Sequence, residues 1–186
     1  MDIDEKKYWF DFIDGDLQAL SILFSLYAKG LFSYGMKIYP DEELAKDCIQ
    51  EVFIQLIRRR DKLKRDEINR GLVYRMLRNK IIDEIKLISR RKLADSRIQK
   101  NCVDFEADQE RLHIGDEEEA SRERLLSAAL GHLSSHQKEA MFLKYSDGLT
   151  YEQISQVMGI YISSARTLIY RTLKQLKSEL LGRRQD

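Results

Sequence analysis

The sequence predicts an all-α protein made of two small helical domains joined by a flexible linker, the second domain being a helix-turn-helix. Three observations lead to this prediction. Apolar residues recur at spacings of three and four, the helical period, and no stretch alternates as a strand does. Only one proline occurs in the 186 residues. The hydrophobic content of 43% is enough for one or two small cores.

The first predicted domain, residues 1–92, begins with a helix that follows the turn at residues 14–16. Apolar residues at helical spacing continue to about Leu31. We expect this helix to end there, with Gly30 and Gly35 as candidate interruptions.

Two more helices complete this domain, over about residues 41–60 and 69–90. Pro40 and Asp41 open the earlier one, and Glu42 and Glu43 put further carboxylates into its first turn, where they suit the positive end of a helix. In both helices, apolar residues form a stripe that predicts packing on a shared core.

Residues 93–122 are predicted to form an acidic, flexible linker. Apolar residues become sparse there, and residues 115–119 are Gly-Asp-Glu-Glu-Glu. Helical periodicity returns at Leu125, so the second domain is assigned to residues 123–186. Ser134 and Gln137 have the spacing of a capping box at the start of its next helix.

Near the carboxyl end of this domain, Gly159 separates two helical patterns. A helix over residues 151–158 is capped by Thr150 with Gln153, and Gly159 suits a turn that needs a left-handed residue. A second helix over about residues 163–180 points a narrow stripe inward: Ala165, Leu168 or Ile169, Thr172 and Leu176. Its other face is rich in basic residues, which is typical of a helix-turn-helix that reads duplex DNA; an ordinary helical hairpin with a basic solvated face is the alternative.

Charge is distributed unevenly along the chain although the net charge is only +1. Residues 1–57 carry −6, residues 58–100 carry +10, residues 101–124 carry −6 and residues 125–186 carry +3. Basic blocks of this kind indicate a polyanionic partner.

Other functional classes receive little support from the sequence. No apolar run approaches a membrane span and the first ten residues lack an apolar signal core, so we expect a soluble cytoplasmic protein without membrane insertion. Cys48 and Cys102 are far apart and suggest no disulfide framework. His132 and His136 are four residues apart, but a predicted helix break separates them, so no metal, no cofactor and no enzymatic activity is expected.

Three stretches carry motifs in a fixed order. They are LAKDCIQEVFIQL at residues 44–56, VYRMLRNKIIDEIKLISRRK at residues 73–92, and the helix-turn-helix stretch at residues 133–176. Together they resemble the bacterial RNA polymerase sigma factors of the extracytoplasmic-function class, over about residues 12–90 and 125–180. The resemblance implies a promoter-specificity factor that binds core RNA polymerase, recognises promoter DNA and helps to open it.

In the first stretch, the family motif is matched by Ala45, Asp47, Gln50, Glu51 and Phe53. In the family this helix docks on a coiled coil of the polymerase β′ subunit, and the β subunit is a further contact. By that resemblance the polymerase-binding residues are the mixed acidic and apolar set Asp47, Gln50, Glu51 and Ile54. An anti-sigma factor is a partner that the resemblance leaves open.

The second stretch resembles the family helix that binds and helps to open the minus-ten element, with the segment at about residues 61–69 selecting bases. The residues assigned to minus-ten DNA are Arg75, Arg78, Asn79, Lys80, Asp83, Lys86, Arg90 and Arg91. The family's paired positions are Asn79 and Asp83, one helical turn apart, which either cooperate on DNA or form a structural hydrogen-bond pair. Leu72 stands where family members often have Trp.

The third stretch resembles the family's minus-thirty-five reader. The residues assigned to that duplex are Ser163, Ser164, Arg166, Thr167, Tyr170, Arg171 and Lys174. Arginine can read guanine edges, whereas serine, threonine and lysine more often hold phosphates. Ala165 replaces the usual Val, Leu168 stands where a basic residue is frequent, and Ser134-Ser135 replaces a Leu-Pro start.

A stand-alone helix-turn-helix repressor or activator is the alternative function. Such a protein accounts for the third stretch but not for the polymerase-type helix at residues 44–56. It is usually a symmetric dimer that reads spaced half-sites.

Overall fold

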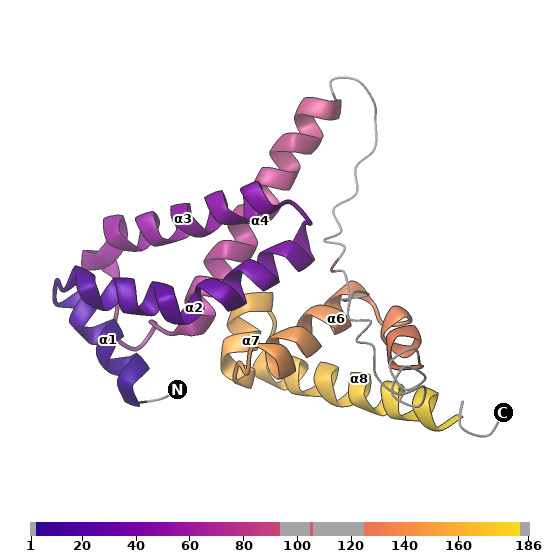
Figure 1. Ribbon diagram of the computed structural model, residues 1–186. Coiled ribbons are helices and arrows are strands. Elements are labelled where there is room, and N and C mark those ends of the chain that lie inside the picture. Colours follow the sequence, from indigo (N-terminus) through magenta and orange to yellow (C-terminus); the bar gives the residue numbers. More distant parts are fainter. Residues whose placement is uncertain (1–2, 94–104, 106–124, 183–186) are drawn as a thin grey trace, which may run out of the picture. The chain divides into compact units, whose positions relative to one another are not determined.

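The computed structural model describes residues 3–93, 105 and 125–182, and within these residues every regular element is helical (Figure 1). The chain divides into two compact units. The predicted all-α fold with two helical domains is therefore confirmed. The predicted linker at residues 93–122 lies, apart from Leu93 and Phe105, outside the described residues, so the predicted domain boundaries stay predictions.

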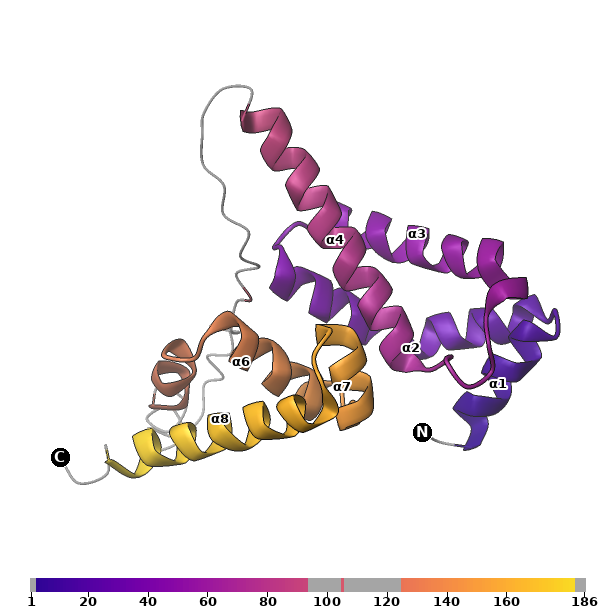
Figure 2. The ribbon, with the colours of Figure 1, turned by 180° about the vertical axis from the view of Figure 1, so that it is seen from behind.

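The first unit consists of four helices in which α2 contacts each of the other three. In both views α4 crosses the α2–α3 pair, and its last turns extend beyond them (Figures 1 and 2). The elements are α1 (Ile3–Ile13), α2 (Leu17–Ile38), α3 (Glu42–Arg59), the short 3-10 helix η1 (Arg60–Lys62) and α4 (Arg70–Leu93). The helices predicted at 41–60 and 69–90 correspond to α3 and α4.

The helix α1 was not predicted from the sequence. At 11 residues it is too short to be stable alone in water, so its stability comes from packing. Trp9 and Phe12 are fully buried, and the Trp9 ring lies 6.2 Å from the ring of Tyr27 on α2. The indole N–H donates a 3.0 Å hydrogen bond to the Tyr27 hydroxyl.

The helix α2 continues to Ile38, so the predicted end near Leu31 is wrong. The reason is a close helix crossing at Gly35. A Cβ on this residue would lie 3.3 Å from the Cβ of Ala45 on α3 and 3.3 Å from the Cδ1 of Ile81 on α4. Glycine here allows α2 to pack closely against Ala45 of α3 and the side chain of Ile81 of α4, and that packing holds the helix together past both glycines.

The second unit has a short helix at residues 125–131, followed by four elements: α6 (Ser135–Met141), the π-helical η2 (Phe142–Ser146), α7 (Tyr151–Met158) and α8 (Ile162–Gly182). Its small core includes Ala129, Leu133 and Leu176.

Local sequence signals define this unit's turns as predicted. Ser134 and Gln137 form a complete capping box before α6. Thr150 and Gln153 make the same reciprocal hydrogen bonds before α7, at 2.9 and 3.2 Å. Gly159 has φ +66°, the left-handed conformation that the turn between α7 and α8 requires. The inward stripe of α8 contains Ile169 rather than Leu168.

Candidate nucleic-acid and protein interfaces

The outer face of α3 carries the four residues predicted to bind polymerase. Asp47, Gln50 and Ile54 are exposed. Glu51 is half-buried and lies 3.7 Å from the guanidinium of Arg58. The opposite face is buried through Ala45, Ile49, Val52 and Phe53. The structure therefore brings the four residues together on one surface of mixed acidic and apolar character.

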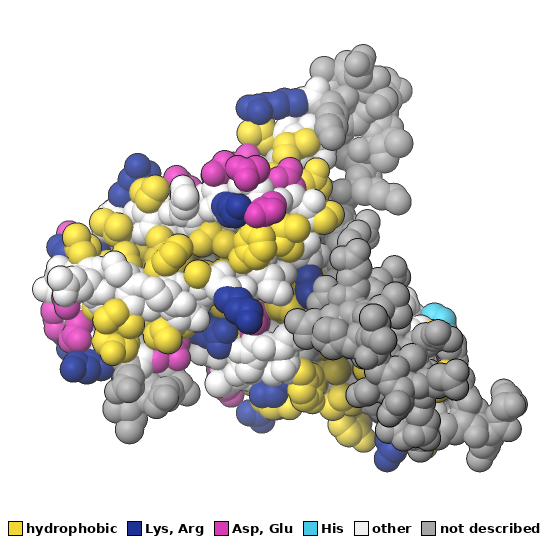
Figure 3. Space-filling view, viewed as in Figure 1, with side chains coloured by type: hydrophobic (Ala, Val, Ile, Leu, Met, Phe, Trp, Pro, Cys, Tyr) yellow, Lys and Arg dark blue, Asp and Glu magenta, His cyan; other side chains and the backbone are white. Residues whose placement is uncertain are grey.

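An apolar surface adjoins this face; of its residues, Ile54 was predicted to bind polymerase, whereas Phe24 and Ile57 were counted only as apolar helix positions. Phe24 of α2 is 40% exposed and its ring lies 5.0 Å from the ring of Phe53, edge to face. On α3, Ile54 and Ile57 are 40% and 46% exposed. Figure 3 shows apolar side chains forming a band along α2 and α3, next to acidic groups. Exposed apolar area of this kind marks interaction surfaces.

The helix α4 carries the eight residues predicted to contact the minus-ten element. Six are exposed and two, Arg78 and Lys80, are half-buried. The Lys80 ammonium lies 2.9 Å from Glu84, and this hydrogen bond raises the pKa of Lys80. Asp83 lies 3.8 Å from Lys86, so its carboxylate has a partner other than Asn79. The exposed residues are Arg75, Asn79, Asp83, Lys86, Arg90 and Arg91.

The exposed face of α8 carries all seven residues predicted to contact the minus-thirty-five duplex: Ser163, Ser164, Arg166, Thr167, Tyr170, Arg171 and Lys174. Tyr170 is 67% exposed. The Thr167 hydroxyl donates a 2.8 Å hydrogen bond to the Ser163 carbonyl oxygen, one turn back.

The guanidinium of Arg166 is held by residues of α7 that sequence reasoning missed. It lies 3.5 Å from the carboxylate of Glu152 and 5.5 Å from the ring centroid of Tyr151. The ammonium of Lys144 lies 4.8 Å from the same ring. The pKa of Glu152 is lowered by its own backbone N–H, by the Thr150 hydroxyl and by Arg166, so the carboxylate stays charged. Only the fold brings Glu152 beside Arg166.

Two other reactive side chains, Cys48 and His132, are buried or lie beside a carboxylate. Burial raises the pKa of the Cys48 thiol to about 11, so it stays protonated at neutral pH. The Nδ1 of His132 lies 2.9 Å from Glu179. In the described ranges no group of three or more His, Cys, Asp and Glu side chains is placed to hold a metal ion. No helix described here has the length and apolarity to cross a membrane.

Two family models match the chain, each over one unit. The model for Sigma-70 region 2 matches residues 23–91, and the model for Sigma-70 region 4 matches residues 123–176. Together they cover about two thirds of the chain. The first match contains α3 and nearly all of α4, and the second contains α7 and most of α8.

A curated relative and two solved structures agree with these matches. The RNA polymerase sigma-H factor of Pseudomonas aeruginosa is 24% identical over 174 residues, covering 89% of this chain and 88% of the relative. CnrH, solved with the cytosolic domain of CnrY, has a TM-score of 0.60 at 18% identity and covers 96% of this chain and 98% of that one. The sigma factor RpoE, solved with the anti-sigma factor NepR from Bartonella quintana, has a TM-score of 0.60 at 18% identity, over 88% of this chain and 98% of that one.

A stand-alone helix-turn-helix regulator would explain the region 4 match, but it does not explain the region 2 match on the other unit. The motif order, the two helical units and both region matches lead to one family. The chain therefore belongs to the sigma-70 family and is a promoter-specificity sigma factor of the extracytoplasmic-function type, which binds RNA polymerase and directs transcription initiation at promoter DNA.

Proposed function

We propose that three separate surfaces of this sigma factor each bind a different partner. The outer face of α3 attaches to the coiled coil of the polymerase β′ subunit. The helix α4, with the segment before it, binds and helps to open the minus-ten element. The exposed face of α8 reads the minus-thirty-five duplex, and the polymerase β subunit is a further contact.

The observation that carries this division is the difference in chemistry between the outer faces of α3 and α8. The α3 face combines Asp47 and Glu51 with the exposed apolar Ile54. A carboxylate surface repels phosphates, and an apolar surface gains from burial against protein. The α8 face presents Arg166, Arg171 and Lys174 with hydroxyl groups between them, a set that suits phosphates and base edges.

The minus-ten role of α4 is supported by a cationic track with few competing carboxylates near its end. Arg90 and Arg91 are exposed in the last turns, and Arg75 is exposed in the second turn. A single strand needs such a track for its backbone together with a stacking group or pocket for an unpaired base.

Further partners and location follow from the same role. A sigma factor works where RNA polymerase is, so we place this chain in the cytoplasm. We also infer that it acts by binding alone, without catalysis and without a cofactor. RpoE, which it resembles in fold, was solved with an anti-sigma factor, and we infer that a protein of this kind covers this chain too.

Reversal of charge on α3 tests the polymerase surface. We expect Asp47→Lys to weaken binding to core RNA polymerase at least about tenfold, because it places a cation where the partner complements a carboxylate. The measurement is a titration of labelled full-length protein with core polymerase. Glu42→Lys on the same helix is the matched control, since Glu42 is 61% exposed, pairs with Lys46 at 2.6 Å and lies about 140° around the helix from Asp47. Equal affinity of both variants and the wild type would remove the α3 face from the interface.

A further inference from the structure

The amino-terminal residues 3–16 have no role assigned by the comparisons, because the region 2 match begins at residue 23. They form α1 and the turn to α2. Besides α2, the helix α1 contacts η1, which leads into the segment predicted to select minus-ten bases. Three arginines spaced five residues apart connect this segment to α1 and α2: Arg60, Arg65 and Arg70.

Arg60, in η1, lies against the turn at Gly15. Its Nη1 lies 3.6 Å from the position a Cβ on Gly15 would take. Gly15 has φ +113°, a conformation that favours glycine. The guanidinium at the start of the segment therefore lies beside the turn between α1 and α2.

Arg65, in the middle of the segment, is held by two residues of α1 and its turn. Its Nη2 lies 2.5 Å from the Oδ1 of Asp14. Its guanidinium carbon lies 5.0 Å from the ring centroid of Phe10. The two contacts restrain the position of the group, although both partners of the ion pair are more than half exposed.

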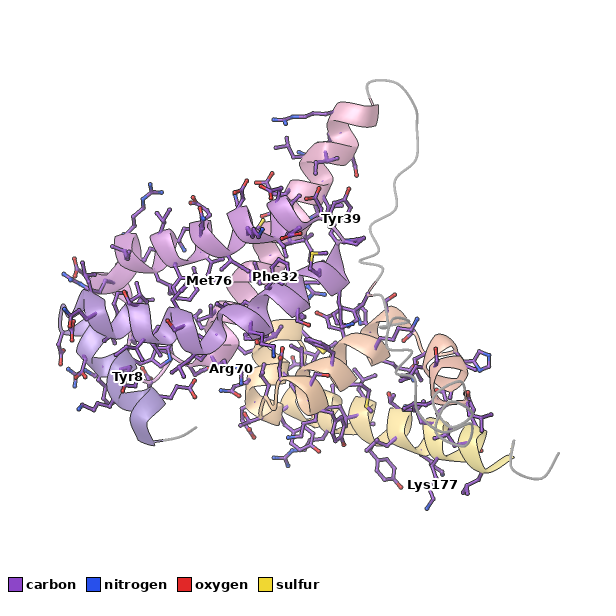
Figure 4. All side chains as sticks on the ribbon, viewed as in Figure 1. Tyr8, Phe32, Tyr39, Arg70, Met76 and Lys177 are labelled. Atoms are coloured by element: carbon purple, nitrogen blue, oxygen red, sulfur yellow. The ribbon has the colours of Figure 1, made fainter. Side chains whose placement is uncertain are left out.

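Arg70, at the start of α4, closes the segment from the other end (Figure 4). Its guanidinium carbon lies 5.6 Å from the Tyr27 ring and 5.4 Å from the Tyr74 ring, and its Nη2 donates a 3.2 Å hydrogen bond to the Tyr74 hydroxyl. Tyr27 in turn accepts from Trp9 and donates to Glu5, both on α1. Burial and Glu5 raise the pKa of Tyr27, so it stays a neutral donor.

Between these arginines the backbone makes few internal bonds. The Leu63 N–H donates to the Arg60 carbonyl oxygen at 3.0 Å, and the Glu67 N–H donates to the Lys64 carbonyl oxygen at 3.1 Å. A segment with so little regular structure takes one shape only if the surrounding side chains hold it. A pocket for an unpaired base must already have its shape when the base arrives, since ordering it at that moment costs affinity.

We propose that α1 and the turn at residues 14–16 position the segment at residues 63–69 for capture of an unpaired promoter base, with Asp14 and Phe10 as positioning residues acting through Arg65. The proposal rests on the minus-ten role of this segment in the proposed function. It gives the region before the family match a part in promoter opening rather than in polymerase binding.

The substitution Asp14→Asn distinguishes this proposal from the alternative that Arg65 only binds phosphate. The two predict opposite changes when the Asp14 charge is removed. If Asp14 positions the segment, removing its charge loosens the segment and slows opening. If Arg65 only grips phosphate, loss of the carboxylate frees the guanidinium and strengthens DNA binding. The matched control is Glu42→Gln, which breaks an exposed ion pair with Lys46 at 2.6 Å on another helix.

Hydrogen exchange in the free full-length protein is the first measurement. For Asp14→Asn we expect the hydrogen-bonded amides of Leu63 and Glu67 to exchange about two- to fivefold faster than in the wild type, with the core of α2 unchanged, because an exposed ion pair contributes up to about 1 kcal/mol. Phe10→Leu should produce a change of similar size. Unchanged exchange in both variants would overturn the proposal.

Open-complex formation is the second measurement, with core polymerase and a duplex promoter recovered by run-off transcription from a genomic library. We expect Asp14→Asn to slow opening about two- to fivefold while core polymerase affinity and the Glu42→Gln control stay at the wild-type value. Faster or equal opening would overturn the proposal. If the wild type opened no promoter at all, the proposed function would fail, and the exchange experiment would still decide whether α1 holds the segment.

Discussion

The two units of this sigma factor are stabilised in different ways. The first buries large side chains from four helices, among them Trp9, Phe12, Leu31, Tyr34 and Tyr74 at 0% exposure. The second buries aliphatic side chains such as Leu143, Leu149 and Ile154 at 0% exposure, and two capping boxes set the starts of α6 and α7. Burial of a large apolar group contributes more free energy than a cap does, so we expect the loss of a core side chain in the first unit to cost more than the loss of a cap in the second.

The difference also bears on function. In the first unit, cations near the proposed minus-ten surface have partners: Arg65 pairs with Asp14, and Lys80 with Glu84. On α8, Arg166 also pairs with Glu152, but it lies on a regular helix, whereas Arg65 lies in an irregular segment. A unit that opens DNA must hold an irregular segment in shape, whereas a unit that reads an intact duplex needs only a straight helix with exposed side chains.

The largest expected effect is the loss of a core side chain in the first unit. We expect Leu31→Ala to lower the free energy of unfolding by about 2–5 kcal/mol, because it leaves a cavity at a fully buried site. Trp9 is the single tryptophan and is buried in this unit, so its fluorescence during urea titration reports the change directly. The control Leu26→Ala, on the same helix but 56% exposed, should change stability by less than about 0.5 kcal/mol. Equal effects of the two variants would show that the stability of the first unit does not depend on its buried side chains.

A smaller effect is expected from a helix cap in the second unit. Thr150→Ala removes the hydroxyl that accepts from the Gln153 N–H, and we expect a loss of about 0.5–2 kcal/mol. Hydrogen exchange at residues 151–158 measures it without disturbing the Trp9 signal. Ser155→Ala is the control, since its hydroxyl only donates to the Glu152 carbonyl oxygen within the helix. Protection of α7 that is unaltered by Thr150→Ala would show that caps contribute little there.

The smallest expected effect concerns a single phosphate contact of α8. Removing one such contact reduces by about one unit the slope of log affinity for duplex against log salt concentration. When salt rises from 0.05 to 0.2 M, the factor by which Arg171→Ala loses affinity should therefore be about three to four times smaller than the factor for the wild type. Fluorescence anisotropy with a minus-thirty-five duplex measures the slope. Lys177→Ala, an exposed cation nearer the end of the same helix (Figure 4), is the control and should keep the wild-type slope. If the slope changed equally in Arg171→Ala and Lys177→Ala, the change would be due to the net charge of the helix and not to a specific phosphate contact.

Much of the fold was predictable because local signals define it. The acidic N-cap at Asp41, the capping box at Thr150 and the left-handed Gly159 each act within four residues, so their consequences are readable from sequence. The stripe on α3 likewise separates the buried Ala45 from the exposed Asp47 by period alone.

What sequence reasoning missed depends on residues far apart in the chain. The helix α1 exists because Trp9 meets Tyr27, and α2 continues past Gly30 because Gly35 fits between Ala45 and Ile81. The same holds for Arg166 beside Glu152 and for Arg65 beside Asp14, pairs separated by 14 and 51 residues.

The sequence by itself determined the helical class, the two-unit order, the family motifs and most helix starts, because caps, periodicity and composition act locally. Tertiary structure decided where α2 ends, that α1 forms at all, and which cations are held in place before DNA arrives. Those outcomes depend on packing and Coulomb energies between distant residues, which are set only when the chain has folded.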